Sequence, residues 1–266
     1  MSFTKRTLLS VLAVSTAALA ACATSPLGRH QLVLMPDAQM DQMGVAAYQE
    51  MKGTQKLSQN SAENTYVRCV ANAITSALPK SGNWEVNVFV DDSANAFALP
   101  GGKIGVNSGL LKVAQTPDQL AAVLGHEVGH VMAKHSNERM SIQFATQTGM
   151  QLVQAVSGEA TPEKQQLFGL LGLGSQVGIT LPFSRKHEAE ADLIGLELMA
   201  KAGFDPRQSV ELWKNMARAN SGEPPEFLST HPANSTRIKG LEANMNNAVA
   251  IYNKAKQAGR NPSCQM

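Results

Sequence analysis

The sequence lacks the features that mark fibrous, disulfide-rich or nucleic-acid-binding proteins. Only three of its 266 residues are cysteine, only 5% are aromatic, and no run of five or more basic residues occurs. A disulfide-stabilised miniprotein is therefore excluded, and a nucleic-acid partner has no electrostatic support. With 43% hydrophobic and 17% charged residues, the chain has a globular composition and is long enough for one large or two small domains.

The beginning of the chain resembles a bacterial lipoprotein export signal. Two basic residues precede an apolar stretch at 8–20, which is too short to span a bilayer comfortably. The Leu-Ala-Ala-Cys that ends at Cys22 resembles a lipobox, in which the cysteine becomes the lipid-modified first residue after cleavage. Ala23, rather than aspartate, follows Cys22, which favours a periplasm-facing position at the outer membrane. An ordinary secretory signal with a coincidental cysteine is the alternative.

These observations predict three segments. We expect a removed signal peptide at 1–21, a lipidated tether at 22–40 and one folded domain at 41–266. Removal of the signal peptide takes two of the 23 basic residues and leaves 21 against 21 acidic ones. The mature chain is therefore neutral, and its contact with the membrane is expected to come from acyl chains.

Two cysteines remain in the mature chain, Cys69 and Cys264. An isolated pair in an oxidising compartment usually forms a bond, so we expect a disulfide that ties the C-terminal tail to an early helix. Two free thiols are the alternative.

Hydrophobic patterning predicts an α+β fold that is mainly α. Alternating apolar residues predict a strand at 84–90, and a Pro-Gly-Gly turn predicts a hairpin of strands 95–99 and 103–106. The apolar, glycine-rich segment at 167–181 fits either a closely packed buried segment or a mobile cover over the site. Helices are expected at 40–78, from Thr116-Pro117 onward, at 138–154, at 185–202, from Asp205-Pro206 onward and from Ser235 onward.

The strongest motif is His126-Glu127-Val128-Gly129-His130, which falls within an expected helix. Residues at i and i+4 point the same way from a helix, so His126 and His130 can reach one metal ion. Glu127 lies about 100° round the helix axis from His126, near enough to address a water molecule beside the ion. This arrangement is typical of a zinc-dependent hydrolase.

A zinc hydrolase needs a third protein ligand if one position is to stay open for water. The later sequence His187-Glu188-Ala189-Glu190-Ala191-Asp192 offers candidates on a second helix. Glu188 and Asp192 are again i and i+4, so one can bind the ion while the other orients its neighbours. The spacing ranks Glu188 first and His187 second.

The motifs occur in an order that resembles the HtpX / CAAX-prenyl-protease family of zinc metallopeptidases, most closely its soluble periplasmic branch. They are Asn-Ala-Phe-Ala-Leu-Pro-Gly-Gly at 95–102, the HExxH sequence, and Ser-Arg-x-x-Glu-x-x-Ala-Asp at 184–192. The resemblance covers roughly residues 40–245 and implies a zincin-like metallopeptidase domain with a small β-sheet beside the zinc-binding helix. It implies one Zn²⁺ per chain held by His126, His130 and Glu188, with Glu127 as general base and Asp192 supporting a ligand.

The resemblance also draws attention to His231, in Ser-Thr-His-Pro, and to Arg237. Two roles stay open for His231. It donates a hydrogen bond to the developing oxyanion, or it occupies the open zinc position in a resting state until substrate displaces it. Arg237 is expected to support the ligands, as Asp192 does, or to share the oxyanion role.

A strand that includes Asn95, Ala96 and Phe97 is expected to hold an extended peptide by adding it to the edge of the sheet. The alternative is that this hairpin only supports the zinc helix.

Taken together, the sequence predicts a membrane-tethered, periplasm-facing zinc endopeptidase that acts on misfolded or unassembled envelope proteins. Expected partners are protein substrates, the membrane through a lipid anchor and, further, the outer-membrane assembly machinery. Two alternatives remain: a chaperone or assembly factor for outer-membrane proteins with little proteolysis, and an amidase that acts on the cell wall.

Overall fold

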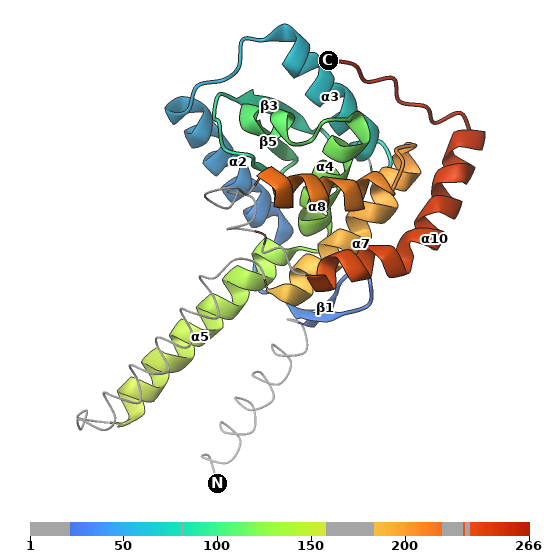
Figure 1. The fold of residues 1–266 in the computed structure, drawn as a ribbon. Helices are drawn as coiled ribbons and strands as arrows, with labels where there is room; N and C mark the ends of the chain where they lie inside the picture. The colour runs from blue at the N-terminus through green and yellow to red at the C-terminus, as the bar shows by residue number, and fades with distance from the viewer. Residues whose placement is uncertain (1–21, 81, 158–183, 220–230, 232–234) are drawn as a thin grey trace. The chain divides into compact units, whose positions relative to one another are not determined.

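The computed structural model describes residues 22–80, 82–157, 184–219, 231 and 235–266, and they divide into two units (Figure 1). The larger unit takes residues 37–133 and all described residues from 184 onward, and the smaller unit takes 22–36 and 134–157. The expected signal peptide at 1–21 and the glycine-rich segment at 167–181 lie outside the described residues.

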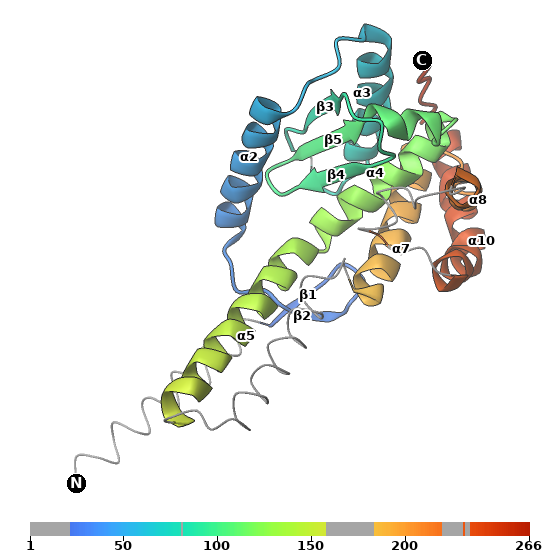
Figure 2. The same cartoon turned by 60° about the vertical axis from the view of Figure 1, so that its left-hand side comes forward.

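A three-stranded sheet lies in the larger unit. Its strands are β3 (Glu85–Phe89), β4 (Ala96–Leu99) and β5 (Lys103–Asn107), in the order β3-β5-β4. Strand β5 pairs in parallel with β3 and antiparallel with β4, so both the expected strand and the expected hairpin are confirmed. Figure 2 shows β4 at the edge of the sheet that faces helix α4 (Pro117–Met132), with which it is in contact.

Helices make up most of the larger unit, which confirms the prediction of a mainly α fold. Besides α4 and the short 3₁₀ turn η1 (Ser108–Lys112), the helices are α2 (Asp37–Thr54), α3 (Ser61–Thr75), α7 (Arg185–Ala202), α8 (Gln208–Ala219) and α10 (Ser235–Gln257). Helix α2 contacts strands β4 and β5, α3 packs against β3, and α4 packs against both α7 and α8.

The ends of α4 and α7 follow from their capping residues. The Thr116 hydroxyl accepts a hydrogen bond from the Gln119 amide at 3.2 Å, and the Ser184 hydroxyl accepts one from the His187 amide at 3.3 Å. Each satisfies an amide that the first helical turn leaves without a partner. At its C-terminal end α7 stops at Gly203, whose φ of 92° lies in the left-handed region that glycine tolerates best.

The expected continuous helix at 40–78 is wrong, because the chain breaks between α2 and α3. The Asn60 side-chain oxygen accepts hydrogen bonds from the amides of Ala62 at 3.0 Å and Glu63 at 3.4 Å, so Asn60 starts a second helix. Asn-Ser-Ala-Glu at 60–63 is a helix-start signal that overrides the apolar pattern on either side of it.

The smaller unit contains a two-stranded hairpin, β1 (Cys22–Thr24) and β2 (His30–Leu32), and helix α5 (His135–Ser157). Arg29 donates two hydrogen bonds to the Glu138 carboxylate, at 2.7 and 2.6 Å. The Asn137 amide donates to the Met35 carbonyl at 2.7 Å. Part of the segment expected as a tether is therefore folded against α5, and its attachment to a membrane stays a prediction.

The expected disulfide is confirmed. Cys69 of α3 is bonded to Cys264 in the C-terminal tail, with a Cα–Cα distance of 5.6 Å. Within the described part of the chain, none of the helices has both the length and the apolar character needed to cross a bilayer.

Candidate metal centre

Helix α4 places the two histidines of the HExxH motif on one buried face. The exposed fractions of His126 and His130 are 4% and 3%, and their Nε2 atoms lie 3.1 Å apart. The helix approaches α7 closely because both carry a glycine at the crossing. A Cβ atom added to Gly195 would lie 2.6 Å from the backbone nitrogen of His126, and one added to Gly125 would lie 2.8 Å from the Gly195 carbonyl oxygen.

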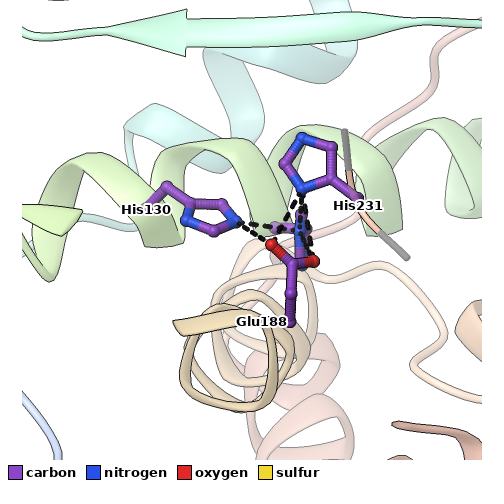
Figure 3. Close-up of side chains that lie close together, drawn as sticks. His130, Glu188 and His231 are labelled. Atoms are coloured by element: carbon purple, nitrogen blue, oxygen red, sulfur yellow. Dashed lines mark hydrogen bonds and ion pairs between the residues drawn. The ribbon is translucent and has the colours of Figure 1, made fainter. Parts of the chain in front are cut away.

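This close crossing brings Glu188 of α7 to the two histidines. Its carboxylate oxygens lie 3.4 Å from the Nε2 atoms of both His126 and His130. His231 completes the cluster, with its Nδ1 atom 3.2 Å from His126 Nε2 and 3.1 Å from Glu188 Oε1. Figure 3 shows His130, Glu188 and His231 pointing toward one another, and all four ligand atoms lie within 4.8 Å of each other.

The other ring nitrogen of His126 shows why this cluster fits a metal ion. Asp192 Oδ1 lies 3.0 Å from His126 Nδ1, and we assign the ring proton to that nitrogen because a carboxylate is an acceptor. Nε2 then presents a lone pair to the cluster, which is the tautomer of a metal-binding histidine held by a carboxylate.

The summed formal charge of the buried groups at this site also favours a bound metal ion. Three buried carboxylates, those of Glu127, Glu188 and Asp192, surround the site, and Arg237 is the buried guanidinium that contacts it. With neutral histidines, the sum is two negative charges, which one divalent cation would neutralise. Nitrogen and carboxylate donors in this number suit Zn²⁺.

Arg237 of α10 joins the two carboxylates of α7. Its Nε and Nη2 atoms each donate to Asp192 at 2.6 Å, and its Nη1 donates to Glu188 Oε2 at 2.8 Å. A planar guanidinium binds a carboxylate with this paired geometry, which fixes both partners. Arg237 thus contacts the proposed ligand Glu188 and its neighbour Asp192, and both roles expected for Arg237 stay predictions.

Comparison with known proteins places this site in a family. The sequence profile described as peptidase family M48 matches residues 57–245. The chain belongs to peptidase family M48. The resemblance noted in the sequence is confirmed at the level of peptidase family M48. The finer assignment to the HtpX / CAAX-prenyl-protease group stays a prediction.

The chain is also similar to several named proteases. It is 41% identical over 161 residues to the mitochondrial metalloendopeptidase OMA1 of Schizosaccharomyces pombe, which covers 60% of this chain and 46% of the relative. It is 31% identical over 177 residues to the beta-barrel assembly-enhancing protease of Yersinia pestis, covering 64% and 35%. It is 28% identical over 218 residues to the metalloprotease LoiP of Escherichia coli K12, covering 81% and 84%. The chain spans 34% to 57% of the OMA1 relatives it matches.

Glu127 of the M48 motif is buried beside the cluster. Among the described residues its Oε1 atom has no hydrogen-bond partner, and it lies 3.5 Å from His231 Nε2. Burial raises the pKa of Glu127 above its usual value, since water no longer solvates the charged form. Glu188 shows the opposite shift. Burial raises its pKa, but the rings of His126, His130 and His231 close to its carboxylate outweigh burial and lower it.

The remaining expected site residues lie apart from the metal cluster of the M48 domain. His187 is buried in α7 but is not among the clustered ligand atoms. In β4, Phe97 turns its ring toward Phe89 and Tyr48, with ring centroids 5.8 and 6.2 Å away. Strand β4 pairs with β5 alone among the described strands, so its outer edge carries backbone groups that can receive an extended peptide.

One neighbour of the site was missed by sequence reasoning. Trp213 of α8 lies over the Arg237 guanidinium, whose central carbon is 4.2 Å from the ring centroid. The sequence places Trp213 on the buried face of its helix, but it contains no signal for which charged side chain that face meets.

Proposed function

We propose that the protein is a zinc-dependent endopeptidase of the bacterial cell envelope. The observation that carries this proposal is the convergence of His126, His130 and Glu188 beside the buried carboxylate of Glu127. Three protein ligands leave a fourth position free for chemistry in catalytic zinc sites. Relatives named as metalloendopeptidases and a metalloprotease support the same reaction class.

Bound zinc would supply a Lewis acid that polarises the scissile carbonyl and makes a water molecule acidic near neutral pH. Glu127 then accepts the proton of the attacking water and passes it to the leaving amine. Its raised pKa suits this exchange, because a stronger base accepts the proton and still releases it. Asp192 holds the His126 ring, and Arg237 holds Asp192 and Glu188.

His231 is proposed to occupy the fourth ligand position in a resting state. Its Nδ1 atom faces the ligand cluster while its Nε2 lies 3.5 Å from Glu127. The ring therefore fills the space between the ligands and the base, where the reacting water belongs. Substrate must displace His231 before the reacting water can occupy that space.

Strand β4 is proposed to bind the substrate. The segment from Asn95 to Phe97 lies at the sheet edge next to α4, which carries the HExxH motif. A peptide added antiparallel to this edge would make backbone hydrogen bonds, so its binding affinity would depend little on the peptide sequence. The Phe97 ring packs against Phe89, so the backbone of Phe97 is the part that would bind the peptide.

The envelope location is proposed from the N-terminal sequence, in which Cys22 ends a lipobox-like motif after an apolar stretch. We propose lipid attachment at Cys22, a periplasm-facing position at the outer membrane, and misfolded or unassembled envelope proteins as substrates. The Yersinia relative named for β-barrel assembly supports an association with outer-membrane assembly machinery.

Casein cleavage by zinc-loaded Glu127→Gln protein tests the reaction. We expect zinc content, measured by elemental analysis, to stay at one ion per chain while cleavage is lost. Glu197→Gln, at a half-exposed position on α7, is the matched control and should cleave as the wild type does. Persistent cleavage by Glu127→Gln would remove Glu127 as the base. A wild-type protein that binds zinc and prevents aggregation of unfolded outer-membrane proteins without cutting casein would favour the assembly-factor alternative.

A further inference from the structure

The guanidinium of Arg237 donates hydrogen bonds to both Glu188 and Asp192. The exposed fraction of Arg237 is 4%, so its positive charge is almost completely shielded from water. These hydrogen bonds all lie near the plane of the guanidinium, since its N–H groups point outward in that plane. In-plane bonds satisfy the edges of the group and leave its two faces to other neighbours.

The indole face of Trp213 lies against the guanidinium. The central carbon of the Arg237 guanidinium lies 4.2 Å from the indole centroid, and the exposed fraction of Trp213 is 6%. The face of an indole ring is electronegative and attracts a cation, most strongly where water is excluded. Trp213 comes from α8, whereas the ligands come from α4, α7 and the segment at His231.

We propose that Trp213 is a positioning residue for the zinc site and acts through Arg237. Contact with the indole face holds the guanidinium where Nη1 reaches Glu188 and the Nε–Nη2 edge reaches Asp192. Asp192 in turn holds His126. One aromatic side chain thus orients two zinc ligands through Arg237.

The proposal rests on the proposed zinc site, and it differs from a purely structural role in what it predicts. A tryptophan that only fills the core would lower stability when removed but would leave the affinity of the folded protein for zinc unchanged. A positioning tryptophan also lowers zinc affinity, since loss of a group that orients ligands typically weakens binding. Metal affinity therefore separates the two roles.

The experiment compares Trp213→Leu, Trp213→Phe and Trp84→Leu, each checked by circular dichroism. Trp84 is the other of the two tryptophans, partly buried just before β3, and serves as the matched control. Competition with a chromogenic chelator should show zinc binding weakened about tenfold in Trp213→Leu. Trp213→Phe keeps an aromatic face and should fall between Trp213→Leu and wild type, and Trp84→Leu should match wild type. A folded Trp213→Leu protein that binds zinc as tightly as wild type would overturn the proposal.

Fluorescence gives a second readout that needs no destabilising change. In a Trp84→Phe protein, emission comes from Trp213, and zinc titration should change it as Arg237 and Glu188 adjust. No change over a titration that loads the site would count against the proposal.

Asp192→Asn separates this proposal from the zinc site itself. If Asp192→Asn weakens zinc binding and Trp213→Leu does not, only the role of Trp213 is wrong. If neither variant nor Glu188→Ala weakens it, the proposed zinc site is wrong as well.

Discussion

Among single residues, the neighbours His187 and Glu188 were both candidates for the third zinc ligand, and their positions on α7 separate them. Only Glu188 has its ligand atoms within the cluster, 3.4 Å from the Nε2 atoms of both His126 and His130. Glu188→Ala should therefore lower zinc affinity at least about 100-fold, more than loss of a supporting residue does. His187→Ala should keep one zinc per chain. Elemental analysis after dialysis measures both, and the reverse pattern would make His187 the ligand.

His231 gives a second prediction for a single residue. Because its ring lies between the ligand cluster and Glu127, removing it should free that space. His231→Ala should retain zinc through the three other ligands and raise kcat on an unstructured peptide severalfold. Steady-state kinetics with parallel zinc analysis measure this. A lower kcat at full zinc occupancy would instead assign His231 to oxyanion stabilisation.

Between elements, the crossing of α4 and α7 decides whether the ligands can meet. A Cβ on residue 195 would lie 2.6 Å from the His126 nitrogen, closer than real Cβ contacts. Gly195→Ala should therefore separate the helices, lower the free energy of unfolding by about 1–3 kcal/mol and weaken zinc binding. Denaturant titration and chelator competition measure the two effects.

Gly240→Ala in α10 is the matched control, since an added Cβ there meets nothing within 4 Å. Alanine favours a helix interior over glycine by about 0.5–1 kcal/mol, so this variant should be slightly more stable. If Gly195→Ala is as stable as Gly240→Ala, close approach at the crossing does not limit the site.

The same elements show what local sequence can predict. Thr116, Ser184 and Gly203 mark helix ends through bonds to their own neighbours, so their positions follow from the sequence. Asn60 is an equally local signal for the start of a helix, but the long apolar pattern around it led to the prediction of one continuous helix. The contact between Trp213 and Arg237 depends on how α8 and α10 pack, and helix spacing contains no information about that packing.

Across the whole molecule, the larger unit consists of two stretches of chain, residues 37–133 and those from 184 onward. His126 and His130 lie on the first stretch, whereas Glu188, His231 and Arg237 lie on the second. The HExxH spacing predicts its own pair of ligands because one helix carries both. Neither stretch contains all the residues of the site, so the site forms only when the two stretches pack together in the folded unit.

The disulfide joins these two stretches, linking Cys69 to Cys264 across 195 residues of sequence. Closing so long a loop restricts the unfolded chain, which in the loop-entropy model stabilises the fold by about 5 kcal/mol. The Cys69→Ser/Cys264→Ser double variant should lower the free energy of unfolding by about that amount. Casein cleavage at 25 °C should persist, because neither cysteine lies among the clustered ligands. Dithiothreitol should destabilise the wild type to the level of the double variant and leave the double variant unchanged. Equal stability of wild type and variant under oxidising conditions would show that the bond does not stabilise the fold.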